Sequence, residues 1–282
     1  MIYMPNWYKF AYSKINSMKK ILIVVSLILA VFSFTLNGQT KPVEQVKPTD
    51  YKLPDSVNKL DANGLKSGYW IERQGELTSK GIYVTNLKTG NWIIYYSNNS
   101  IHKLEYYNKG AKDGICLQFD RKGKLTLQEN YTRGLLHGQT IYYGQYTETP
   151  MSEISFANGK KNGQFRQYYD NSKIQEESNY KNDIKDGSSH WYNKNGKLIA
   201  EYNYKNGSFD GIQKTFYDND TLQTSTMYLN NQLSGDYKEY YRNGKLKVSG
   251  KYVAGLKEAT WTEFDELQKP QKVIKYKAGA VK

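Results

Sequence analysis

The side chains that most often perform chemistry are few in this sequence and do not line up. The three histidines fall at unrelated places in the repeating unit described below, so no column stacks them as metal ligands; they are His102, His137 and His190. One column of carboxylates does exist: Glu153, Glu177 and Glu201. Catalytic carboxylates need a pocket that gives them opposed environments, whereas a row along an open sheet pairs with basic neighbours. We therefore expect no enzyme, no cofactor and no metal.

The chain has a single cysteine, Cys116. One thiol can form neither a disulfide framework nor a cysteine-rich zinc site. It occupies a repeat position where other units place Trp or Phe, so we interpret it as a small buried apolar side chain.

The elements that must position any site are set by a unit of about 24 residues that runs nine times from residue 61 onward. Its first column is glycine: Gly68, Gly90, Gly114, Gly138, Gly163, Gly187, Gly211 and Gly235, with Ala259 in the ninth place. Aromatic residues follow five positions later in eight units, and a second aromatic column, mostly tyrosine, runs from Tyr83 to Tyr276. A fixed period of this length predicts a repeat array in which each unit packs only against its neighbours.

Two turns punctuate each unit, and the segments between them are short and rich in Tyr, Ile, Leu and Thr. Most turns contain glycine, and Asn or Asp replaces it elsewhere: Asn99, Asp183, Asp220 and Asn231. Tight hairpins need positive φ, which Asn and Asp tolerate best after glycine. We predict an all-β fold: an elongated array of about nine antiparallel hairpins, roughly 17 strands, in one long twisted meander sheet.

Alternation assigns the side chains to two faces. Counting from the first glycine as zero, we expect positions 2, 6, 11 and 17 on a packed face, with Trp92, Leu198 and Tyr204 as examples. Positions 3, 5 and 14 then form the second face. A one-residue bulge would exchange parts of these two sets.

The second face changes from apolar to basic at the fifth unit. Its basic residues stand beside the position-5 aromatics and form the candidate binding ladder: Arg166, Tyr168, His190, Tyr192, Lys214, Phe216, Lys238 and Tyr240. Hairpin pairing places Glu177 opposite Arg166 and Glu201 opposite His190, so these two bases are predicted to be paired. Lys214 and Lys238 face serines and are predicted to be unpaired. A solvated strand surface and an anionic ligand site both remain open readings of this ladder.

The first 38 residues have the features of a secretory signal. Met18-Lys19-Lys20 precedes an apolar run from Ile21 to Phe34, and Gly38 follows. A run of about 14 residues is shorter than the roughly 20 that a spanning helix needs. We predict a hydrophobic signal helix in 1–38, cleaved after Gly38, with translation starting at either Met1 or Met18. An uncleaved membrane anchor is the alternative.

Residues 39–60 are predicted to be a linker, since prolines recur there among polar residues; the repeat domain is then 61–282. The chain carries 40 Lys and Arg against 27 Asp and Glu, a net charge of +13, which favours acidic partners without specifying one. We expect an exported protein in the periplasm, cell envelope or medium, and export disfavours nucleic acid as a partner.

Strings such as Gly235-Asp-Tyr-Lys-Glu-Tyr-Tyr-Arg-Asn-Gly-Lys-Leu246 resemble the bacterial variant of the MORN (membrane occupation and recognition nexus) repeat. The resemblance covers about 61–279. It implies a twisted sheet of successive hairpins that acts as a scaffold or contact surface, and it offers no catalytic residues. Bacterial members are often labelled antitoxin-like, which implies a cytoplasmic toxin as partner.

Three functions follow as hypotheses. The first is an exported, non-enzymatic scaffold that contacts a protein or an envelope component. The second is a module that binds a glycan, an anionic polymer or anionic lipid through the aromatic and basic ladder. The third is a toxin-neutralising protein, which requires the apolar N-terminus to have been misread.

Overall fold

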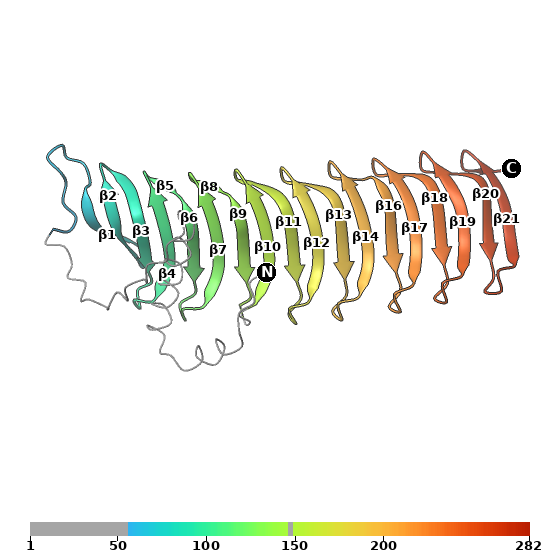
Figure 1. Ribbon diagram of the computed structural model, residues 1–282, viewed down its shortest axis with the longest axis horizontal. Coiled ribbons are helices and arrows are strands. Elements are labelled where there is room, and N and C mark those ends of the chain that lie inside the picture. The colour runs from blue at the N-terminus through green and yellow to red at the C-terminus, as the bar shows by residue number, and fades with distance from the viewer. Residues whose placement is uncertain (1–55, 146–148) are drawn as a thin grey trace, which may run out of the picture. The chain divides into compact units, whose positions relative to one another are not determined.

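The computed structural model describes residues 56–145 and 149–282 (Figure 1). The predicted signal helix, its cleavage site and residues 39–55 of the predicted linker lie outside the described residues. Residues 56–282 form a unit of their own.

The described residues contain 22 strands in one sheet. They are β1 (Gly68–Gln74), β2 (Leu77–Val84), β3 (Leu87–Tyr95), β4 (Ile101–Asn108), β5 (Ala111–Lys112), β6 (Gly114–Phe119), β7 (Leu125–Thr132), β8 (Leu135–Leu136), β9 (Gly138–Tyr143), β10 (Pro150–Ala157), β11 (Lys160–Tyr168), β12 (Ile174–Lys181), β13 (Ile184–Tyr192), β14 (Leu198–Lys205), β15 (Ser208–Phe209), β16 (Gly211–Phe216), β17 (Leu222–Leu229), β18 (Gln232–Tyr240), β19 (Leu246–Val253), β20 (Leu256–Phe264), β21 (Pro270–Lys277) and β22 (Ala280–Val281).

The strands follow one another across the sheet in sequence order, and every pair is antiparallel (Figure 1). This confirms the predicted all-β meander of hairpins. The count exceeds the expected 17 because three strands are interrupted: β4 pairs with both β5 and β6, β7 with β8 and β9, and β14 with β15 and β16. The short β22 adds one more, and the remaining 18 strands are two for each of the nine units.

Two-residue turns join each unit to the next, and both of their residues have positive φ. Lys109 and Gly110 have φ of 48° and 83°, and Asn182 and Asp183 have 50° and 70°. This is the type I′ geometry, whose twist matches that of the flanking strands. The predicted substitutes for glycine are confirmed, since all four have positive φ: Asn99 63°, Asp183 70°, Asp220 66° and Asn231 65°.

The first-column glycines have a different structural role from the glycines of these turns. Their φ values run from 68° at Gly90 to 112° at Gly235. They lie where the register between neighbouring units shifts, as between Ser178 and Tyr180 on β12 against β13. The unit therefore begins with glycine because a bulge there requires left-handed backbone. Ala259 occupies the ninth place with φ of 62°.

A second set of bulges corrects the predicted faces. In the sixth unit His190 pairs with Glu201, but Tyr192 pairs with Leu198 after a register shift. Because directly paired residues share a face, position 11 lies with positions 3, 5 and 14, and its placement on the packed face was wrong. Positions 2 and 17 do share a face with positions 4, 13 and 15, since Ser189 is opposite Tyr202 and, two residues on, Trp191 is opposite Ala200.

Position 6, also expected on the packed face, belongs to the longer turn and links units instead. Where it is tyrosine, its hydroxyl donates to the carbonyl at position 5 of the next unit. The four bonds run from Tyr96 to Phe119 (3.0 Å), Tyr169 to Tyr192 (2.8 Å), Tyr217 to Tyr240 (2.8 Å) and Tyr241 to Phe264 (2.7 Å). Hydrogen bonds between consecutive hairpins therefore link the longer turns along one side of the sheet.

Substituting Ala259 with Gly should stabilise the array. Left-handed backbone costs an L residue roughly 1–2 kcal/mol, and the extra flexibility of unfolded glycine offsets about 0.5–1 of it. We expect the free energy of unfolding to rise by about 0.5–1 kcal/mol, seen as a higher urea midpoint at unchanged m-value. The matched change Gly187→Ala, at φ 100°, should lower the midpoint; a rise there would contradict the assignment.

Candidate functional site

Neither face of the sheet is covered by another element within 56–145 and 149–282, where the structure has strands of one sheet only (Figure 1). We name the face that carries positions −2, 2, 4, 13, 15 and 17 the aromatic face. The face that carries positions 3, 5, 11 and 14 is named the basic-ladder face. Any ligand site made by this part of the chain has to be built from the side chains of one of these two faces.

The aromatic face holds the best-buried side chains. Trp92 and Trp261 are 0% and 6% exposed. Each indole lies flat over a glycine of the preceding strand, Gly81 or Gly250, where a Cβ atom would overlap the ring. Each indole N–H donates to a backbone carbonyl at 3.2 Å. Gly81 and Gly250 each stand two residues before the tyrosine of the second aromatic column, so tryptophan at position 2 requires glycine at that place in the unit before it.

Aromatic rings continue this packing along the face at both ends of the array. Trp92 lies between Tyr83 and Tyr107, with ring centroids 5.0 and 6.4 Å away, both edge to face. Trp261 lies between Tyr252 and Tyr276 in the same way, at 4.9 and 6.4 Å. Such pairs add about 0.5–1.5 kcal/mol each beyond burial, which compensates in part for the lack of a second layer.

A column of lysines at position −2 completes this face, and the sequence analysis missed it. Four of the six lysines are paired in register with a position-17 tyrosine and Lys161 is paired with Phe156. All six hold the ammonium group over an aromatic ring. The closest are Lys88, 4.0 Å from the Trp92 ring, and Lys257, 4.2 Å from the Trp261 ring. The others are Lys66, Lys112, Lys161 and Lys185. The signal was visible as lysine two residues before the first-column glycine in six of nine units.

Several of these lysines also neutralise carboxylates on the aromatic face. Lys112 lies 2.8 Å from the Glu105 carboxylate, which also accepts a hydrogen bond of 2.9 Å from the Tyr107 hydroxyl. Burial raises the pKa of Glu105, but the hydrogen bond and charge of Lys112 outweigh it, so the net shift is downward. Glu105 is therefore a structural anion, consistent with the pairing expected for carboxylates on an open sheet.

The middle of the aromatic face is polar instead of aromatic. The Ser178 hydroxyl, 1% exposed, bonds to Glu176 and Ser189, each at 2.6 Å. Lys185 closes the network at 2.5 Å from Glu176, and the Trp191 indole donates to Ser189 at 3.1 Å. Small serines at positions 15 and 2 replace the Gly–Trp pair of the two ends.

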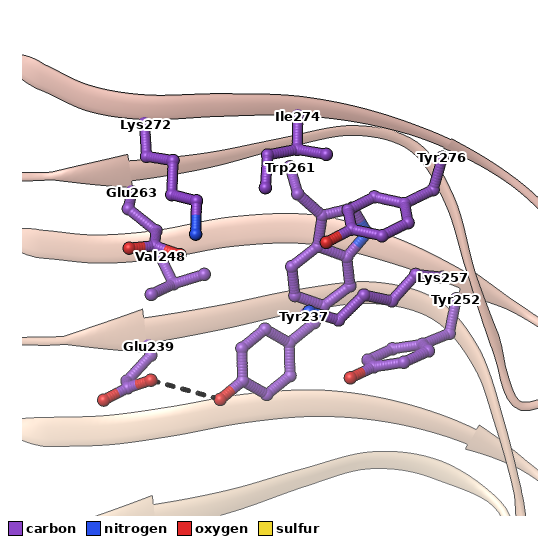
Figure 2. A pocket seen from close by; sticks show the side chains of 10 residues that line it. All are labelled: Tyr237, Glu239, Val248, Tyr252, Lys257, Trp261, Glu263, Lys272, Ile274 and Tyr276. Atoms are coloured by element: carbon purple, nitrogen blue, oxygen red, sulfur yellow. Dashed lines mark hydrogen bonds between the residues drawn. The ribbon is translucent and has the colours of Figure 1, made fainter. Parts of the chain in front are cut away.

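The face is hollowed at its C-terminal end, between β18 and β21 (Figure 2). The hollow has a volume of about 220 Å³. Its wall comprises Tyr237, Glu239, Val248, Tyr252, Lys257, Trp261, Glu263, Lys272, Ile274 and Tyr276. The Tyr237 hydroxyl donates to Glu239 at 3.3 Å; burial and the neighbouring carboxylate raise the pKa of Tyr237 to about 12. This hydroxyl stays protonated at neutral pH.

The opposite face gathers the eight predicted ladder residues, because positions 3 and 5 follow one another along β11, β13, β16 and β18. Arg166 is paired as predicted: its Nε donates to Glu177 at 2.7 Å, and its Nη1 lies 3.9 Å from Glu153. Burial and Glu153 raise the pKa of Tyr168. Burial and Glu177 raise the pKa of Tyr192, whose hydroxyl donates to Glu177 at 3.4 Å.

The charge pattern of this ladder differs from the prediction at Lys214. Its Nζ lies 3.4 Å from Glu201, the residue expected to pair with His190, so Lys214 was wrongly taken as unpaired. Glu201 lies between both bases in register, and the longer lysine reaches it. Lys238 faces Ser225 and Ser249 and has no ion pair among the described residues. The ladder is therefore mostly neutralised within the chain.

Comparison with known families agrees with this geometry. Residues 161–182, 185–206, 209–230 and 233–254 each match the model described as the MORN repeat variant. Residues 161–254 are thus four tandem MORN repeat variants, a module that is generally non-enzymatic. No curated protein matches the sequence significantly.

Across 56–145 and 149–282, no three His, Cys, Asp or Glu side chains gather closely enough to hold a metal ion. Over the same ranges the structure has no helix of the length and apolarity needed to cross a membrane.

Adding a methyl group beneath the C-terminal indole should disrupt the aromatic face. Gly250→Ala places a Cβ where the Trp261 ring lies, and such overpacking costs about 1–3 kcal/mol. We expect a lower urea midpoint and a weaker near-ultraviolet circular dichroism signal. In a Trp261→Leu background the same change should cost much less, because the ring is gone. Equal costs in both backgrounds would show that the two residues are not coupled.

Proposed function

We propose that the chain is an exported, non-enzymatic repeat scaffold that holds a partner protein or a component of the cell envelope on an uncovered face of its sheet. The MORN repeat variants in 161–254 support the scaffold, and the composition of residues 1–38 supports export. The absence of an aligned catalytic set in the sequence is the reason for proposing no enzyme.

The observation that carries the proposal is the single layer. Large side chains such as Tyr237, Tyr252 and Tyr276 are only partly buried, because their neighbours in the sheet cover their edges and no second layer covers their outer sides among the described residues. A globular domain ordinarily covers such rings with a second layer. Here the rings line a continuous surface, and adding a partner over it would bury more apolar area.

The aromatic face is the better candidate for this contact. It has the hollow of about 220 Å³ and two clusters of rings, and the lysines over them keep the surface soluble in the absence of a partner. The basic-ladder face has fewer unpaired positive charges than we predicted from the sequence, since Arg166 and Lys214 are paired with glutamates.

Cell fractionation with mass analysis of the native N-terminus tests the export part. We expect a chain that begins near Gln39 outside the cytoplasm. A full-length chain in the membrane fraction would mean that the apolar segment anchors the array. A full-length soluble chain in the cytoplasm would contradict export and would make a co-encoded toxin the first partner to test.

The alternative function is binding of an anionic lipid or envelope polymer through the basic ladder. The observation in its favour is Lys238, which is exposed and faces serines on both sides. In this alternative Tyr168, Tyr192, Phe216 and Tyr240 would flank the ligand.

Charge reversal separates the two functions. The double change Lys214→Glu with Lys238→Glu should leave retention on envelope fractions and its salt dependence unchanged, because our proposal places the contact on the other face. The control pair Lys205→Glu with Lys277→Glu alters the net charge equally at the edge of the sheet. A loss of retention above twofold in the ladder pair alone would favour the alternative.

A further inference from the structure

Glu263 differs from four other carboxylates of the aromatic face. Glu72, Glu105, Glu176 and Glu239 each have a lysine ammonium within 2.5–2.8 Å. Glu263 is exposed, and its carboxylate has no ion pair or hydrogen bond to any described residue. It is paired in register with Lys272, whose ammonium also lacks a partner within the described ranges. One free acceptor group and one free donor group therefore stand side by side in the wall of the hollow (Figure 2).

The remaining wall alternates apolar and hydroxyl-bearing surface. Val248 and Ile274 contribute aliphatic groups, and Trp261 contributes the edge of its indole (Figure 2). The phenol groups of Tyr252 and Tyr276 have no hydrogen-bond partner among the described residues, so they can donate and accept. A ligand that fits this wall needs C–H groups toward the apolar groups of Val248 and Ile274 and several hydroxyl-type groups toward Glu263 and Lys272.

The charges of the hollow exclude a strongly charged ligand. Glu239 is already neutralised by Lys247 at 2.7 Å, and the ammonium of Lys257 occupies the ring surface of Trp261 at 4.2 Å, where a cationic ligand would bind. The charged residues of the wall itself are two glutamates, Glu239 and Glu263, and two lysines, Lys257 and Lys272, so the lining has no net formal charge. The volume of about 220 Å³ is below the range of about 300–1,000 Å³ usual for drug-sized ligands, so it suits one small ring.

We propose that this hollow binds one ring of a neutral saccharide, with Glu263 and Lys272 bonded to neighbouring hydroxyl groups and the ring C–H groups against Val248 and Ile274. The inference rests on the proposed function, since it names the ligand of one uncovered face. It assigns glycan binding to the aromatic face, opposite the ladder from which the sequence led us to expect it.

Saturation-transfer NMR and calorimetry on the full chain test the proposal, with cellotriose, maltotriose and chitotriose as probes. We expect at least one to bind with a millimolar dissociation constant. Glu263→Gln and Lys272→Gln should each weaken it about tenfold, the loss expected for one charge-assisted hydrogen bond. Both side chains are exposed, so the variants should fold normally.

Lys275→Gln is the matched control: it lies on β21 as Lys272 does, but on the opposite face, and should leave binding unchanged. The proposal would be overturned if no probe binds at concentrations up to about 20 mM. It would also be overturned if a probe binds but Glu263→Gln and Lys272→Gln leave its affinity unchanged. Tighter binding of a lysine-rich peptide at the same residues would overturn it too. If no saccharide binds while a partner protein is still retained, this inference is wrong and the proposed scaffold function stands. If the saccharide binds but the chain is found in the cytoplasm, this inference stands and the proposed export is wrong.

Discussion

The sheet depends on left-handed backbone at fixed intervals. Successive units are joined by a two-residue turn in which both residues have positive φ. Eight of the nine units begin with a glycine in the same region of φ, and the ninth begins with Ala259. These positions set the hairpin register, and the register determines which side chains share a face. Packing then follows: a tryptophan can cover the preceding strand only where that strand presents glycine, as at Gly81 and Gly250. The backbone conformation at these positions therefore determines which side chains can pack against one another.

A single-layer sheet has to be stable without a conventional core, and the side chains show how. Within residues 56–145 and 149–282 only seven hydrophobic residues are buried, among them Trp92, Cys116 and Trp261. Edge-to-face rings, ammonium groups over rings and lysine–glutamate pairs supply the rest, and each joins strands that are adjacent or nearly so. Bonds such as that from Tyr217 to the Tyr240 carbonyl add a link at the edge. The same half-buried side chains leave a surface that is prepared for a partner, so stability and binding use one set of residues.

Most of the fold could be predicted from the sequence, because the period and the turn residues are local signals. Asn99, Asp183, Asp220 and Asn231 identified left-handed turns without any structure. The face of position 11 could not be predicted, because the bulge that moves Leu198 beside Tyr192 has no residue signature of its own. Cys116 is buried as expected, at 4% exposure.

The candidate site was predicted less well, for a physical reason. The sequence shows which residues are opposite each other in a hairpin, so Arg166 with Glu177 could be predicted. It does not show which of two neighbours a shared carboxylate will choose, and Glu201 bonds to Lys214 from the next hairpin. The hollow near Trp261 depends on side chains from four strands, and such a combination becomes visible only when their directions are known.

Because the strands pair strictly in sequence order, the number of units sets the length of the sheet. Since none of the described strands pairs with a segment distant in the sequence, a whole unit can be gained or lost by duplication or deletion without disturbing the others. Each unit adds two strands and so increases the distance between the two ends of the sheet by about 9.5 Å. The distance between sites on different units can thus change in equal steps over evolution, while the chemistry of each site stays the same.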